Sequence, residues 1–111
     1  MAMTYAKRLS HAYHDAGLVS ASVGPRREIG LVIRLDPVWN NGLDKECTVR
    51  LGAIRNFEEV ATFVRALGRP ERPDRCLDQV LQLDWSSDGN VYIELERHGF
   101  IEVMSPKVLE I

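Results

Sequence analysis

The sequence predicts an α+β fold in two layers, in which two helices pack on one face of a mainly antiparallel sheet of about five to six strands. Two kinds of pattern support this prediction. Several stretches alternate apolar and polar residues, and the short connections between them make neighbouring strands antiparallel. Other stretches carry apolar residues at the three-and-four spacing of an amphipathic helix. The predicted order is α-β-β-β-α-β-β-β, within a single globular domain that covers residues 1–111.

The first predicted element is a short helix that begins near Tyr5 and stops before Gly17. Glycine suits this position because it lacks Cβ and readily adopts the left-handed conformation that ends helices. The apolar side of the helix is formed by Tyr5, Leu9, Ala12 and Ala16. This spacing predicts a helix that buries one side against the sheet.

Three strands are predicted next, over residues 18–23, 28–36 and 46–52. The second strand alternates clearly, and its apolar side is formed by Ile29, Leu31, Ile33 and Leu35. Such alternation is typical of a strand with one buried face and one open face. The breaks between these strands contain Gly, Pro, Asn and Asp, which favour turns.

The second predicted helix covers residues 56–67. Asn56 is the expected cap of its first turn, and Glu59 stands three residues later, in the position of a capping box. Gly68 followed by Pro70 is expected to end the helix. Its apolar stripe is wide, which predicts burial against a sheet rather than along a narrow helical seam.

The last third of the chain predicts three further strands. Residues 77–85 and 91–95 form a hairpin around a Gly-containing turn, with Leu77, Leu81, Leu83 and Trp85 assigned to one face of its first strand. A second tight turn leads into residues 100–104. Ser105 and Pro106 are expected to end the sheet, because proline cannot donate to a strand ladder.

Composition excludes several classes of function. The chain holds 14 basic and 16 acidic residues, so it lacks the overall field of a nucleic-acid or membrane-surface binder. It contains no apolar run of about 18 residues, so no membrane span is expected. Cys47 and Cys76 lie far apart without the spacing of metal ligands. We therefore expect a cytoplasmic protein with reduced cysteines and with neither a metal nor a cofactor.

Charge is distributed unevenly along the chain. Residues 1–76 hold 12 basic and 9 acidic side chains, whereas residues 77–111 hold 2 basic and 7 acidic ones. Alternation places several of these acids on the open face of the last strands. The residues assigned to that face are Asp78, Gln82, Asp84, Tyr92, Glu94 and Glu96, with Glu102 beside them. A sheet surface with several carboxylates around a tyrosine is complementary in charge to a basic partner protein, and the tyrosine offers it an anchor.

Two alternatives stay open for the candidate binding residues. The acidic face can be an ordinary solvated surface in which Arg34 and Arg50 of neighbouring strands neutralise Glu94 or Glu96. Trp39, on a polar loop, is a candidate anchor for a partner. Alternatively, it folds back and closes one end of the core.

His98 and a row of arginines are weaker candidates for functional residues. His98 in a tight turn is a candidate general base, but the sequence places no nucleophile beside it. A row of arginines that could bind phosphate consists of Arg65, Arg69, Arg72 and Arg75. Glu71 and Asp74 are interleaved with this row, which favours a solvated loop.

These patterns predict a small protein-binding domain, of the inhibitor or chaperone-like kind, rather than an enzyme. Its candidate partner-binding residues are Trp39, Asp84, Tyr92, Glu94 and Glu96. The alternative is a small-molecule binder or an enzyme with a pocket between helices and sheet, lined by Tyr13, Phe63, Trp85 and Phe100. An apolar chain end also predicts a homodimer, through Val108, Leu109 and Ile111.

Overall fold

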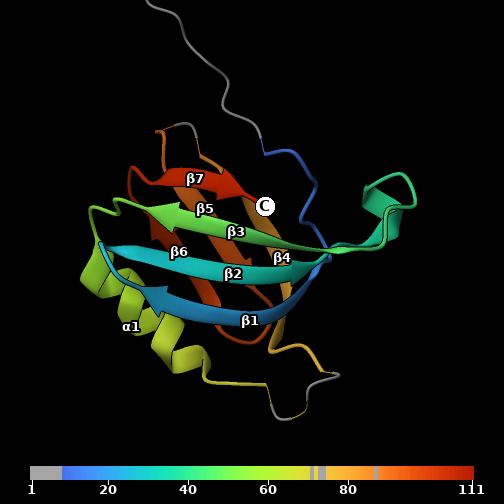
Figure 1. The fold of residues 1–111 in the computed structure, drawn as a ribbon, viewed down its shortest axis with the longest axis horizontal. Helices are drawn as coiled ribbons and strands as arrows, with labels where there is room; N and C mark the ends of the chain where they lie inside the picture. Colours follow the sequence, from blue (N-terminus) through green and yellow to red (C-terminus); the bar gives the residue numbers. More distant parts are fainter. Residues whose placement is uncertain (1–8, 71, 73–74, 87) are drawn as a thin grey trace, which may run out of the picture.

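The structure is a computed structural model that describes residues 9–70, 72, 75–86 and 88–111. Within this part of the chain, one α-helix accompanies a single sheet of seven strands (Figure 1). The elements are β1 (Gly17–Gly24), β2 (Glu28–Arg34), the 3-10 helix η1 (Pro37–Trp39), β3 (Glu46–Gly52), α1 (Phe57–Leu67), β4 (Asp78–Trp85), β5 (Val91–Leu95), β6 (Gly99–Val103) and β7 (Lys107–Glu110). The strand order is β6-β5-β4-β1-β2-β3-β7, and every neighbouring pair is antiparallel.

The predicted fold class, with two helices on a sheet of five to six strands, is therefore wrong. Residues 1–8 of the predicted N-terminal helix lie outside the described residues, and residues 9–16 contain turns and bends but no helix. Asp15 has a positive φ of 62°, which a right-handed helix cannot contain. Ala16 is fully buried and donates its N–H to the carbonyl of Tyr13 over 3.2 Å. A single turn thus buries Ala16, whereas Leu9 is half-buried and Ala12 is exposed.

The seventh strand was also missed, because the sheet was expected to end at Ser105 and Pro106. Ser105 instead forms a turn with a φ of 51°, and β7 follows and pairs with β3. Pro106 stands just before this strand, where its missing N–H removes no ladder bond. Beyond β7, Thr48 and Ile111 exchange two backbone hydrogen bonds of 2.8 and 2.9 Å. The apolar chain end is therefore part of the sheet.

The sheet folds over on itself where β1 meets β4. These two strands pair only through Gly17 with Gln79 and Leu18 with Asp78. Figure 1 shows β4, β5 and β6 behind β1, β2 and β3, crossing them at an angle. The core lies between the two halves, and α1 packs against β1, β2 and β6 at one side of it.

Helix α1 confirms its predicted position and its wide buried stripe, formed by Val60, Ala61, Val64 and Leu67. Gly68 ends the helix at a φ of 73°, a conformation that glycine adopts without a Cβ penalty. The predicted side-chain cap by Asn56 is wrong. Its amide instead donates to the carbonyl of Glu102 over 2.8 Å and accepts the N–H of Met104 over 2.9 Å, which ties the helix start to β6. No helix in the described residues is long and apolar enough to cross a membrane.

A bulge in β4 changes which of its residues face the core. The pairing with β5 shifts register between Val80 and Gln82, because one extra residue on a strand moves the following side chains to the opposite face. Val80 and Leu83 are buried, whereas Leu81 is only half-buried. Asp78, assigned to the open face from strict alternation, is 5% exposed, so that assignment is wrong.

Candidate functional site

The outer face of β4, β5 and β6 gathers carboxylates and aromatic rings. The buried residues Leu83, Ile93 and Ile101 point inward, so their neighbours along each strand point outward. We call this surface the acidic face, formed by Gln82, Asp84, Tyr92, Glu94, Phe100 and Glu102. The register places these residues opposite one another, as Asp84 with Tyr92, Glu94 with Phe100, and Tyr92 with Glu102.

A stacked aromatic pair lies among these acids. The rings of Tyr92 and Phe100 are 5.3 Å apart between centroids and inclined by 25°. Phe100 is 63% exposed, although the sequence suggested it as a pocket residue. A large exposed ring on a sheet face is a strong candidate for an interaction anchor.

The acids of this face are not neutralised in the way that the alternative interpretation required. Arg34 pairs with Asp44, with 3.2 Å between Nε and Oδ1. Arg50 lies in register with Gly30 and Leu109, in the other half of the sheet. Across the described residues, no ion pair within 4.0 Å involves an acid of the acidic face. This surface is therefore a region of uncompensated negative charge.

Two of these acids make local hydrogen bonds that fix their positions. Asp84 accepts the N–H of Trp85 over 2.8 Å, and Glu102 accepts from the amide of Asn90 over 2.7 Å. Both donors are uncharged amide groups, so neither bond is an ion pair. Glu96 lies outside the acidic face, in the turn between β5 and β6.

A groove of about 500 Å³ runs between the N-terminal segment and β4. Its lining residues from the N-terminal segment are His11, Ala12, Tyr13 and His14, and those from the sheet are Leu81, Gln82, Leu83, Asp84 and Glu94. Asp84 and Glu94 belong to both the groove and the acidic face. The groove therefore extends the acidic face toward the N-terminal segment.

The N-terminal wall of the groove is held by Glu110 of β7. Its carboxylate accepts the N–H of Ser10 over 2.8 Å and the hydroxyl of Tyr13 over 2.5 Å. Burial, aided by the hydrogen bond to Glu110, raises the pKa of Tyr13 above its usual value, so the hydroxyl stays a donor. Burial also raises the pKa of the neighbouring Cys47 thiol. The wall is thus anchored to the core.

Trp39 connects to this groove through His14. The His14 Nδ1–H donates to the carbonyl of Leu81 over 2.7 Å, since a carbonyl oxygen only accepts. The Trp39 ring meets the His14 ring edge to face, with 4.9 Å between centroids, and its Nε1–H donates to Asp15 over 3.0 Å. Trp39 is 51% exposed. It therefore does not close the core, and it stands beside the groove.

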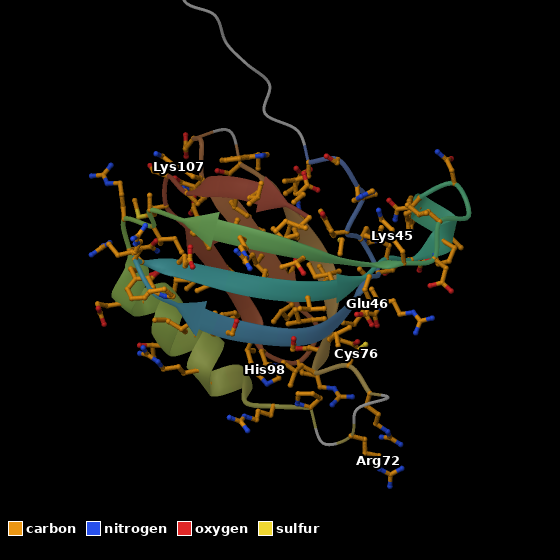
Figure 2. The ribbon with its side chains drawn as sticks, viewed as in Figure 1. Lys45, Glu46, Arg72, Cys76, His98 and Lys107 are labelled. Carbon is orange, nitrogen blue, oxygen red and sulfur yellow. The ribbon has the colours of Figure 1, made fainter. Side chains whose placement is uncertain are left out.

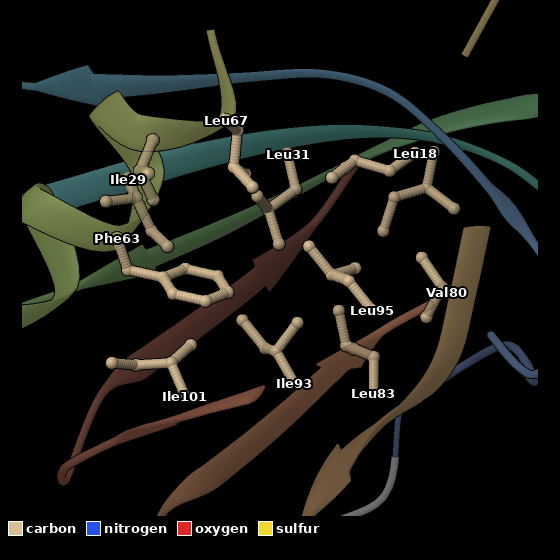
Figure 3. A pocket seen from close by; sticks show the side chains of 12 residues that line it. Leu18, Ile29, Leu31, Phe63, Leu67, Val80, Leu83, Ile93, Leu95 and Ile101 are labelled. Atoms are coloured by element: carbon tan, nitrogen blue, oxygen red, sulfur yellow. The ribbon is translucent and has the colours of Figure 1, made fainter. Parts of the chain in front are cut away.

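The four residues suggested for a small-molecule pocket are not brought together. Tyr13 lines the groove, Phe63 faces the core, Trp85 packs partly buried against the core, and Phe100 is on the acidic face. The space between α1 and the sheet is a cavity of about 10 Å³ with an entirely apolar lining (Figure 3). That volume is close to the minimum needed for one water molecule, so it gives a ligand no room.

Sequence reasoning missed a hydrogen-bonded pair, Asp78 and His98, between β4 and the β5–β6 turn. The buried carboxylate of Asp78 accepts the His98 Nδ1–H over 2.7 Å. It also accepts backbone N–H groups of Gln79, Arg97 and His98 at 2.8 to 3.2 Å. Burial alone would raise the pKa of Asp78, but the hydrogen bonds from His98, Gln79 and Arg97 outweigh it and lower that pKa. Strict alternation takes no account of the bulge in β4, so it placed Asp78 on the open face and did not predict this pair.

Comparison with known proteins identifies no relative. No family model, no curated protein and no solved structure matches the chain. Among the described residues, no three His, Cys, Asp or Glu side chains are grouped closely enough to hold a metal ion.

Proposed function

We propose that this protein is a protein-binding domain whose acidic face receives an arginine-bearing segment of a basic partner protein. The observation that carries the proposal is the stacked pair of the exposed Phe100 and the half-buried Tyr92, which is bordered by Asp84 and Glu94. These acids have no basic partner among the described residues. The surface therefore offers a guanidinium group both of the contacts it favours.

Arginine fits this surface better than other side chains do. A guanidinium group stacks on aromatic rings and forms two parallel hydrogen bonds with a carboxylate. The groove beside Asp84 and Glu94, about 500 Å³ in volume, gives long side chains a place to lie. Uncompensated negative charge also speeds the approach of a basic partner. A neutralising inhibitor, a chaperone or an adaptor can each use such a surface.

We also propose that the protein is located in the cytoplasm. Cys47 and Cys76 are both free thiols, one buried and one exposed. Reduced thiols are typical of cytosolic proteins. A fluorescent fusion found outside the cytoplasm would contradict this part of the proposal.

Binding of a defined basic peptide tests the proposal. The probe is a synthetic peptide of alternating arginine and valine, and a peptide of alternating aspartate and valine is its control. We expect saturable binding of the arginine peptide only. Glu94→Lys is expected to weaken that binding at least tenfold, because it places a like charge beside the guanidinium groups.

Two further variants separate a specific surface from net charge. Glu46→Lys makes the same charge change on an exposed residue of β3, in the other half of the sheet, and is expected to change affinity less than twofold. Phe100→Ala is expected to weaken binding while leaving thermal unfolding unchanged, because the ring is 63% exposed. Equal losses in Glu94→Lys and Glu46→Lys, or no binding by the natural chain, would contradict the proposal.

A further inference from the structure

A second pocket, of about 240 Å³, lies between the loop that follows α1 and the turn between β5 and β6. Arg69 and Arg75 of the loop line it together with Arg97 and His98 of the turn. We call it the arginine pocket. Leu67 and Leu77 form an apolar part of its wall. The fold thus brings together basic residues from two segments that are distant in the sequence.

His98 is held in this pocket by the buried Asp78. The Asp78 side chain has no exposed surface, and its carboxylate holds the His98 Nδ1–H at 2.7 Å. This bond leaves Nε2 as the ring nitrogen available to a ligand. The backbone N–H groups of Arg97 and His98 bond to the same carboxylate. The turn that carries two of the basic side chains is therefore rigidly positioned.

The three arginines have no anionic partner within the described residues. No ion pair and no side-chain hydrogen bond there involves Arg69, Arg75 or Arg97. None of the described carboxylates is among the residues that line the pocket. Three guanidinium groups around one hollow repel one another, and an anion between them removes that repulsion.

We propose that the arginine pocket binds the phosphate group of a small phosphomonoester. Guanidinium groups match phosphate oxygens with paired hydrogen bonds, and three of them suit a doubly charged group better than a carboxylate. The volume is just below the range of sites for drug-sized ligands. Among the described residues, no aromatic side chain except the His98 ring lines the pocket, so no broad ring on which a base stacks is found there. Leu67 and Leu77 can contact a short carbon chain.

This site is independent of the acidic face. It is built from the loop after α1 and from the β5–β6 turn, whereas the acidic face is built from the outward residues of the strands themselves. Figure 2 shows His98 beside the loop between α1 and β4, with Cys76 near the β4 end of that loop and Arg72 at its outer end. Arg72 does not line the pocket. It therefore provides a matched control.

Calorimetric titration with glycerol 3-phosphate tests the proposal, with inorganic phosphate and glycerol as comparison ligands. We expect saturable binding of glycerol 3-phosphate, weaker binding of inorganic phosphate and no binding of glycerol. Arg75→Gln and Arg97→Gln are each expected to weaken binding about tenfold, as loss of a hydrogen bond to a charged group does. Both residues are exposed, so the fold is expected to persist.

Arg72→Gln removes the same charge from the same loop and is expected to leave the affinity unchanged. Equal losses in Arg72→Gln and Arg75→Gln would overturn the proposal, because they would show attraction to net charge alone. Inorganic phosphate binding as tightly as glycerol 3-phosphate would overturn the assignment to an ester. Absence of saturable binding to the natural chain would overturn the site itself.

Discussion

Asp78→Ala is expected to lower the free energy of unfolding by about 3 kcal/mol, because a buried donor that loses its acceptor costs about 1–3 kcal/mol and several donors lose theirs here. The carboxylate is fully buried and accepts hydrogen bonds from Gln79, Arg97 and His98. Removing it leaves several N–H groups without an acceptor in a place that water does not reach easily. It also frees the turn between β5 and β6 from β4. Chemical denaturation measures the loss.

The matched control for this variant is Asp44→Ala. Asp44 also pairs with a basic side chain, Arg34, but both partners are more than half exposed. Exposed pairs contribute at most about 1 kcal/mol, so this substitution is expected to have a small effect. If Asp78→Ala costs no more than Asp44→Ala, the buried carboxylate does not hold the turn as described.

The contribution of Asp78 is also expected to depend on pH. Its pKa is lower in the folded state than in the unfolded chain, where it is about 3.9. The stability it supplies is therefore fully present above that value and is lost as pH falls through the folded-state pKa. Denaturation of the natural chain and of Asp78→Asn is expected to differ most near neutral pH, with the gap narrowing in acid. A constant gap would contradict the lowered pKa.

Ile33→Ala is expected to destabilise the fold by about 4 kcal/mol, within the range for deleting a buried isoleucine side chain. Ile33 is 0% exposed and lies on β2, opposite Leu18 of β1 and Cys47 of β3. The new void joins an apolar cavity that Ile33 already lines. Apolar cavities stay empty of water, so little of the lost contact energy is recovered.

Its neighbour Val32 gives a matched control, because it lies on the same strand and is only half-buried. Val32→Ala is expected to cost less than about 1 kcal/mol, since it removes less buried apolar surface. Comparable losses from the two substitutions in chemical denaturation would show that the core does not lie on the side of β2 that the structure assigns.

Much of the fold could be predicted from local patterns. The helix at residues 57–67 and the strand at 46–52 have strong periodicity and clear breaks, and both form where expected. The prediction of an N-terminal helix was wrong because Ala12 and Ala16 are also compatible with a turn. The spacing of apolar residues alone does not distinguish a helix from a turn. β7 was missed because Pro106 is at its start, where proline is tolerated.

The candidate surfaces differ in how far they could be predicted. Alternation along β5 correctly put Tyr92 and Glu94 on one face, because a strand without a bulge keeps period two. The stacking of Phe100 on Tyr92 depends on register across a turn, which alternation does not fix. Asp78 and His98 meet because of the bulge in β4. Long-range placements of this kind leave no local signal in the sequence.

Backbone amide shifts of the isotope-labelled protein, recorded while the arginine peptide is added, show whether the acidic face is the surface that binds a basic partner. We expect saturable changes concentrated on β4, β5 and β6, with the largest at Tyr92, Glu94 and Phe100, and none on the outward residues of β3. Changes spread evenly over both halves of the sheet, or concentrated away from the acidic face, would contradict binding at this face.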